Sequence, residues 1–350
     1  MKKLALGFSL LCTINVFANY DFSDHEAFCE NSYLNSEKSK TAVANGGKYQ
    51  NGYKKLGKRT VPRMVQYRGC RFDVEWMEQT RDLICENEKT KSEVGDLSFI
   101  KIPDEIIFIF DGAGDFDANL GLNSLGASNI DGSEGEDVWM GNFNGGILFS
   151  KVLRGTNHNG NREIHYHSSS GLHSRENYSS AVSCAEEVIA YKKILNDLGK
   201  KTDSKWIVMG FSNGGQLSTE FQYDMGAIGQ SIDLSISVDP VEQALFYFPS
   251  KLSKTVGDKK HRLTKRMVNF YQDTDYNSIQ GFKLRGKPVK GADENLHITS
   301  DIDYKLNEDG YHNHLRIARS NIVESLIKCE LNNISIDSNE NCNYSQYQND

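Results

Sequence analysis

Residues 205–215 read Lys-Trp-Ile-Val-Met-Gly-Phe-Ser-Asn-Gly-Gly. After Lys205, residues 206–209 are aromatic, β-branched and apolar, a composition typical of a buried strand. Glycines then flank Ser212 on both sides, and the residues from Gly214 to Met225 have the composition of a helix. The stretch therefore predicts a strand that turns sharply into a helix, with Ser212 at the turn.

The pattern Gly210-x-Ser212-x-Gly214 suits a serine that acts as a nucleophile. Glycines two before and two after remove side chains that would collide with the neighbouring strand and helix. The start of the following helix directs free backbone amides toward charge that develops at the serine. We therefore interpret Ser212 as a candidate nucleophile and the Asn213 amide as one oxyanion donor, against the alternative of an inert serine in a tight turn.

Further strands and helices alternate on either side of this stretch. The apolar run 106–110 predicts a strand buried on both faces, and we expect more strands at 146–153, 163–167, 234–238 and 266–271. Helices are expected at 178–198, at 214–225, and from residue 314 or just after it to about 331, and residues 273–314 are expected to form mostly loop. Strands that alternate with helices predict an α/β fold with a mainly parallel sheet and helices on both faces.

The chain divides into four predicted parts. Residues 1–18 have two lysines, an apolar core and the small-residue ending Val16-Phe17-Ala18, which together predict a cleaved signal peptide. Residues 19–100 are expected to form an N-terminal extension, with strands 71–77 and 82–85 as an opening hairpin and the first strands of the sheet. Residues 101–331 form the expected catalytic core, and residues 332–350 a tail.

The charge and the cysteines indicate which partners and which cellular compartment to expect. The net charge of −7 gives no electrostatic footprint for nucleic acid, and no segment after the leader is apolar enough to span a membrane. Six cysteines follow the leader, an even number that predicts disulfides in a secreted or periplasmic protein. They are Cys29, Cys70, Cys85, Cys184, Cys329 and Cys342. Their pairing stays open, with a bridge between Cys70 and Cys85 as one possibility.

A nucleophilic serine needs a base, and the base needs an acid to orient it. His314 is favoured as the base because it directly precedes the last predicted helix, with His312 and His297 as alternatives. Asp239 is favoured as the acid because it ends the strand after the elbow helix and is followed by a proline. Asp273 and Asp275, after the next strand, are the alternatives.

A second oxyanion donor is expected in the loop that follows strand 106–110. The sequence there is Asp111-Gly112-Ala113-Gly114, and its small residues permit close approach of the backbone to a substrate. The candidates are Ala113 and Gly114.

The sequence from about residue 100 to 330 resembles α/β-hydrolase-fold serine hydrolases. The resemblance is carried by DGAGD after a strand, GFSNGG at the elbow, VDPV after the next strand and a late histidine before a final helix. Residues 237–241, SVDPV, are similar to the corresponding segment of pancreatic-type lipases. That resemblance implies Asp239 as the acid, and esterase, lipase or thioesterase activity.

We therefore expect a serine hydrolase of carboxylic esters or thioesters that needs no cofactor and no metal. An amidase or peptidase on the same residues, and a non-catalytic binding module on a hydrolase scaffold, are the alternatives. The expected substrate is a small or lipid-like acyl ester, and the oligomeric state is left open.

Three other motifs are interpreted as non-catalytic. His165, His167 and His173 could bind a metal, but lining of the pocket is preferred. The Asp/Asn run at 115–119 departs from a calcium loop at its glycine and closing glutamate. The aromatic run 246–249 fits either a pocket wall or ordinary core.

Overall fold

The computed structural model of the 350-residue chain describes eleven stretches. They are residues 53–56, 59–62, 75–86, 95–112, 144–158, 160–168, 174–241, 259–272, 286–298, 313–337 and 340–345.

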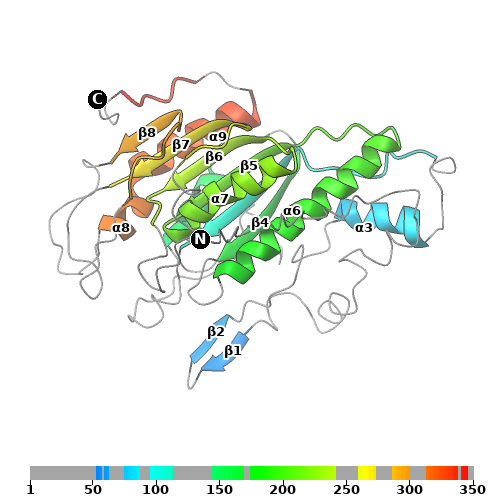
Figure 1. The fold of residues 1–350 in the computed structure, drawn as a ribbon, viewed down its shortest axis with the longest axis horizontal. Coiled ribbons are helices and arrows are strands. Elements are labelled where there is room, and N and C mark those ends of the chain that lie inside the picture. The colour runs from blue at the N-terminus through cyan, green and yellow to red at the C-terminus, as the bar shows by residue number, and fades with distance from the viewer. Residues whose placement is uncertain are drawn as a thin grey trace, which may run out of the picture.

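A six-stranded, all-parallel sheet forms the centre of the molecule, with strand order β4-β3-β5-β6-β7-β8 (Figure 1). The strands are β3 (Glu105–Asp111), β4 (Arg162–Ser168), β5 (Lys205–Phe211), β6 (Ile232–Val238), β7 (Thr264–Tyr271) and β8 (Glu294–His297). Every residue of β3 is buried, as expected for a strand that lies inside a parallel sheet covered on both faces.

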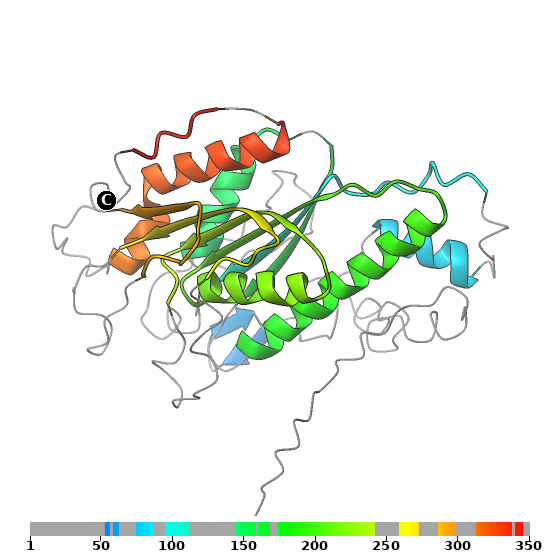
Figure 2. The ribbon, with the colours of Figure 1, turned by 45° about the horizontal axis from the view of Figure 1, so that its top comes forward.

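Helices cover both faces of this sheet, as Figure 2 shows. One face carries α6 (Ser174–Asp197), α7 (Asn213–Ala227) and the short α3 (Glu75–Arg81), and the other carries α5 (Asn144–Arg154) and α9 (Asn321–Ser335). Strand β3 contributes side chains to the core on both faces of the sheet, because successive side chains of a strand point to opposite faces. Ile106 and Phe108 pack toward α6 and α7, and Ile107 packs toward α5 and α9. The predicted α/β architecture is confirmed.

The segment predicted as a strand at 146–153 is instead the helix α5. Leu148, Phe149, Val152 and Leu153 recur three and four residues apart and are buried together against α9 and the sheet. Their spacing fits a helix face, so the prediction of a strand was wrong, and α5 is the first helix on its side of the sheet.

The predicted strands at 71–77 and 82–85 are also incorrect where the structure describes them. Residues 75–81 form α3, and residues Asp82–Glu86 continue it as a turn of π-helix. Trp76, Met77, Leu83 and Ile84 bury one face of this helical segment in the α6 layer.

The described residues before β3 contribute no strand to the six-stranded sheet, although the N-terminal extension was expected to hold its first strands. They contain instead a separate antiparallel pair, β1 (Tyr53–Leu56) and β2 (Arg59–Pro62). The signal-peptide residues lie outside the described part of the chain.

The C-terminal half departs from the prediction in two places. Strand β8 lies within the region expected to be loop. The final helix begins later than expected, because a short helix α8 (Asn313–Arg316) and a 3-10 turn (Ile317–Arg319) precede α9.

A disulfide joins Cys329 of α9 to Cys342 in the C-terminal segment, with Cα atoms 5.8 Å apart. Cys29 and Cys70 lie outside the described stretches, so the proposed bridge from Cys70 to Cys85 does too. Within the described stretches, no helix combines the length and apolar character that crossing a membrane requires.

Candidate active site

Ser212 is the single residue between the end of β5 and the start of α7, and its backbone angles are φ 58° and ψ −127°. A positive φ is uncommon for a residue with a side chain and signals local backbone strain. The turn is held from both sides, because the Ser212 amide donates to the Val238 carbonyl at 2.9 Å and the Ser212 carbonyl accepts from Gly215 and Val241. These bonds hold Ser212 in a backbone conformation that a residue with a side chain would not favour by itself.

Glycine is required at both flanking positions of this turn. A Cβ on Gly210 would overlap the Gly214 carbonyl, and a Cβ on Gly214 would overlap the carbonyl of Phe110 in β3. Helix α7 therefore starts in direct backbone contact with two strands, which is what the Gly-x-Ser-x-Gly pattern allows.

Ser212, His314 and Asp239 form one hydrogen-bonded chain. The distance between Ser212 Oγ and His314 Nε2 is 2.8 Å, and that between His314 Nδ1 and Asp239 Oδ2 is 2.6 Å. With the carboxylate as acceptor, Nδ1–H donates to Asp239, which leaves Nε2 to accept the serine hydroxyl proton. All three side chains are at least nine-tenths buried, and the Phe211 ring stacks on the imidazole at 5.1 Å. This is the arrangement that lets a base deprotonate a serine.

Asp239 directly follows β6 and itself has a positive φ of 45°. Its amide donates to the Phe270 carbonyl at 2.7 Å, which fixes the backbone of the turn. Its carboxylate is fully buried and, beside His314, accepts from the Gln272 amide at 3.1 Å, from Gln272 Nε2 at 2.9 Å and from the Gly286 amide at 2.7 Å. Four donors thus complement the carboxylate and leave its orientation no freedom.

Gln272 and Gly286 were not anticipated from the sequence. Gln272 follows β7, the strand beside β6, so its place at the same sheet edge as Asp239 could have been inferred from strand order. Gly286 lies in an irregular segment with no sequence signal that links it to Asp239.

The backbone after β3 approaches the serine closely. A Cβ on Gly112 would lie 3.0 Å from Ser212 Cβ and 3.1 Å from Phe211 Cδ1. The Gly112 amide is turned inward, to the Asp111 carboxylate at 2.7 Å. The two oxyanion candidates that follow, Ala113 and Gly114, lie outside the described residues.

Asn213 is the first residue of α7, so its backbone amide belongs to the first turn, where helical amides have no partner within the helix. The helix dipole makes this end positive. Its side chain is buried, and Nδ2 has no hydrogen-bond partner within the described part of the chain. The Asn213 amide therefore lies at the positive end of α7, one residue after Ser212.

Of the alternative acids and bases, only His297 lies within the described residues, and it is not part of the hydrogen-bonded chain of Ser212, His314 and Asp239. His297 ends β8 and stacks on the Tyr271 ring at 5.0 Å. His312, Asp273 and Asp275 lie outside the described residues.

The histidines of β4 occupy the buried layer next to α6. His165 Nε2 lies 2.5 Å from Glu163 Oε1, and its ring stacks on Phe108 at 4.8 Å. His167 stacks on the same phenylalanine at 6.2 Å. Across the described stretches, no group of three or more histidine, cysteine, aspartate or glutamate side chains is arranged to hold a metal. His173 and the runs 115–119 and 246–249 lie outside them.

No protein-family model matches the chain, and no curated protein matches it.

Proposed function

We propose that the protein is an exported serine hydrolase with an α/β-hydrolase fold that cleaves carboxylic esters or thioesters. One observation carries the proposal: the buried chain of hydrogen bonds from Ser212 through His314 to Asp239, set at the carboxyl end of parallel strands. A serine, an imidazole and a carboxylate in this order are the parts that nucleophilic acyl transfer needs.

The reaction follows from the roles of the three side chains. Ser212 Oγ attacks the acyl carbon while His314 Nε2 takes its proton, and Asp239 stabilises the imidazolium that forms. His314 then gives the proton to the departing alcohol or thiol, which leaves an acyl-serine. Water, deprotonated by the same imidazole, attacks the acyl-serine and releases the carboxylic acid and the free serine.

The oxyanion of each tetrahedral intermediate needs N–H donors close to Ser212. The Asn213 backbone amide at the start of α7 is one proposed donor. The second is assigned to Ala113 or Gly114, and the approach of Gly112 to Ser212 supports this assignment because these two residues directly follow Gly112 in the sequence.

The topology supports the proposed fold. The serine follows β5, the acid follows β6 after the elbow helix, and the histidine follows β8, which is the chain order of α/β-hydrolases. The position of Asp239 directly after the strand next to the elbow strand agrees with the resemblance to pancreatic-type lipases.

Export is supported by two independent features. The first 18 residues have the pattern of a signal peptide. The Cys329–Cys342 disulfide fits the oxidising environment of the periplasm or the exterior.

The test is labelling of the folded protein with a fluorophosphonate probe, which reacts with activated serines. We expect labelling at Ser212, and a loss of labelling with a roughly 10⁴-fold or larger fall in kcat for Ser212→Ala and His314→Ala. Ser218→Ala is the matched control, because Ser218 is a buried serine of α7, the helix that follows Ser212. Its hydroxyl donates to the Gly215 carbonyl.

A panel of chromogenic esters, thioesters and peptide anilides then defines the bond cleaved. Faster turnover of the anilides would replace the ester assignment with an amidase or peptidase. A folded protein that is unlabelled and inactive on the whole panel would refute the hydrolase proposal and favour a binding module.

A further inference from the structure

The Gly286 amide that bonds to Asp239 belongs to a segment without regular structure, residues 286–289. Such a segment has no strand or helix ladder of its own. Backbone bonds hold its far end, where the Val289 carbonyl accepts from the Ala292 amide and Lys290 bridges to Lys259, and side chains bond to the rest of its backbone. Two asparagines on neighbouring strands, Asn269 of β7 and Asn295 of β8, supply those bonds.

Asn269 is fully buried and uses its amide nitrogen twice. Nδ2 donates to the Lys287 carbonyl at 3.0 Å and to Asn295 Oδ1 at 2.9 Å. Among the residues that the structure describes, its own Oδ1 has no hydrogen-bond partner. Reversing the amide would place that oxygen against two acceptors, so the orientation is determined by the contacts. A buried acceptor without a partner costs stability. An asparagine at position 269 is therefore explained by the two bonds that its Nδ2 donates, and not by its Oδ1.

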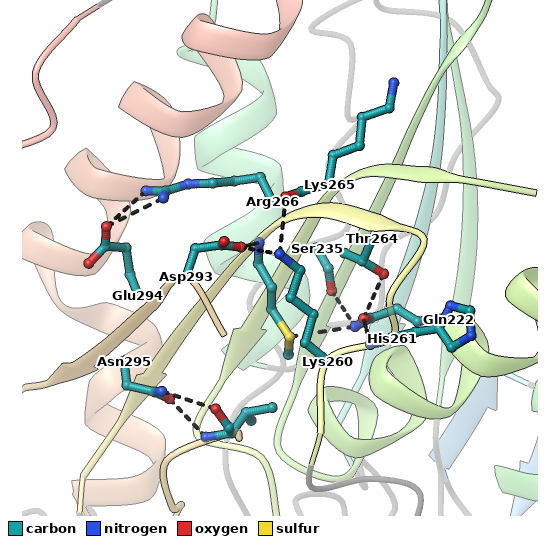
Figure 3. Close-up of polar contacts among 12 residues, drawn as sticks. Gln222, Ser235, Lys260, His261, Thr264, Lys265, Arg266, Asp293, Glu294 and Asn295 are labelled. Atoms are coloured by element: carbon teal, nitrogen blue, oxygen red, sulfur yellow. Dashed lines mark hydrogen bonds and ion pairs between the residues drawn. The ribbon is translucent and has the colours of Figure 1, made fainter. Parts of the chain in front are cut away.

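Asn295 satisfies both backbone groups of Val289 with one side chain. Its Oδ1 accepts from the Val289 amide at 2.8 Å, and its Nδ2 donates to the Val289 carbonyl at 3.0 Å (Figure 3). This pair of bonds imitates one rung of a β-ladder. Asn269 and Asn295 therefore hold the backbone one and three residues after Gly286.

We propose that Asn269 and Asn295, here called the Asn clasp, are positioning residues for the candidate acid. The clasp sets the Gly286 N–H against Asp239 Oδ1, and this bond turns Oδ2 toward His314. The described hydrogen bonds of the two asparagines go to Lys287, to Val289 and to each other, and not to Ser212 or His314. The catalytic consequence of the clasp rests on the proposed hydrolase function, whereas its control of the Gly286 amide does not.

Asn269→Leu and Asn295→Ala test the clasp, because each removes the bonds of one asparagine. We expect kcat to fall about 10- to 100-fold with KM unchanged, since small misplacements of a catalytic group have effects of this size. Asn295→Asp keeps the acceptor for the Val289 amide and for Asn269, and should retain more kcat than Asn295→Ala.

Thr264→Val is the matched control for a loss of stability alone. Thr264 is buried in the same strand as Asn269, and its hydroxyl donates to Gln222 Oε1 of α7 at 2.8 Å rather than to residues 286–289 (Figure 3). We expect a lower Tm but an unchanged kcat. If Thr264→Val reduced kcat as much as the clasp variants at equal Tm, the positioning role would be refuted.

A second measurement separates positioning from general damage. In an Asp239→Asn background the clasp variants should cause no further loss of kcat, because the group they position is already disabled. The same fold-loss in both backgrounds would show that the clasp acts elsewhere and would overturn the proposal.

Hydrogen exchange of the Gly286 amide provides a readout that needs no substrate. We expect exchange at least about tenfold faster in Asn269→Leu and Asn295→Ala than in Thr264→Val. Unchanged exchange would refute the clasp. Faster exchange in a protein that cleaves no ester would support the clasp and refute the hydrolase function.

Discussion

At the scale of single residues, backbone strain gathers at the candidate site. Three non-glycine residues of the described stretches have a positive φ, and Ser212 and Asp239 are two of them. Each such conformation costs on the order of 1–3 kcal/mol and persists only where neighbours enforce it. Here the enforcement is visible as backbone bonds from Ser212 to Val238 and from Asp239 to Phe270.

Gly286→Ala is predicted to inactivate the protein. The new Cβ would overlap Asp239 Oδ1 and displace the carboxylate from His314. We expect kcat to fall about 10³-fold or more, approaching the effect of disabling a triad acid. Steady-state kinetics on the best ester measure this. Gly95→Ala is the control, since a Cβ there meets nothing within 4 Å. A variant as active as Gly95→Ala would contradict the role of this bond.

Lys192 makes stability depend on pH. Its Nζ lies over the Trp206 ring at 5.8 Å, and burial lowers the pKa of its ammonium from 10.5 to about 8. Between these pH values the unfolded chain still binds the proton that the folded protein has lost, so the free energy of unfolding rises with pH in this window. Below pH 8 both states are protonated and the burial penalty is constant.

The comparison is with Lys192→Met, which abolishes the titration. Urea denaturation from pH 7 to pH 10 should show the wild type gaining stability relative to this variant above about pH 8. Lys193→Met, at the exposed neighbouring position, is the control. Parallel curves for the wild type and Lys192→Met would refute the buried titration.

At the scale of elements, the position of His314 depends on the helix that follows it. Helix α8 has four residues, too few to be stable alone, so packing must hold it. The 3-10 turn buries Ile317 and Ala318, and α9 buries Val323 and Ile327 in the same cluster against the sheet. The imidazole is thus positioned by the packing of two short elements, α8 and the 3-10 turn, and of the longer helix α9 that follows them.

Ser320 is the N-cap of α9, and its hydroxyl accepts from the Val323 amide at 3.2 Å. Ser320→Ala should lower the free energy of unfolding by about 1 kcal/mol, because the amide loses its partner. Chemical denaturation measures the change. Ser345→Ala, at an exposed site beyond α9, should stay within about 0.5 kcal/mol of the wild type. An equal effect at both sites would show that the cap contributes nothing.

At the scale of the whole molecule, the C-terminal segment is tied back onto the helix layer. The Cys329–Cys342 disulfide joins it to α9, and the Tyr344 hydroxyl donates to Glu330 of the same helix. Glu330 also pairs with Arg266 of β7, at 2.6 Å. One carboxylate therefore connects the tail, the helix and the sheet.

Replacing both cysteines by serine should lower the free energy of unfolding by about 3 kcal/mol, the value for a loop of similar length. The cause is the greater conformational freedom of the unfolded chain. Denaturation without reductant measures it, and kcat of the folded fraction should be unchanged, because the disulfide lies away from the Ser212 chain of bonds. Asn341→Ser, at an exposed neighbouring position, is the control. Equal stability of both proteins would contradict the prediction.

Local patterns in the sequence accounted for the centre of the fold. The strand, turn and helix around Ser212 were predictable because strand composition and paired glycines act over a few residues. Asp239 was favoured as the residue ending a strand and His314 as the residue before a helix, and the structure brings both to Ser212. The prediction of a strand at 146–153 was wrong because a short apolar run with β-branched residues fits either a strand or a buried helix until its packing partners are known.

Neighbouring residues were enough to predict the parallel α/β order, the turn at Ser212 and a ranked choice of acid and base. The packed molecule was needed to show that α5 is a helix, that β8 extends the sheet, that Gln272 and Gly286 bond to Asp239, and that the Asn clasp bonds to the residues after Gly286. The difference lies in the range of the interactions. A strand or a turn is specified by neighbours in the chain, whereas the bond between Gly286 and Asp239 joins residues 47 positions apart and exists only after the sheet has formed.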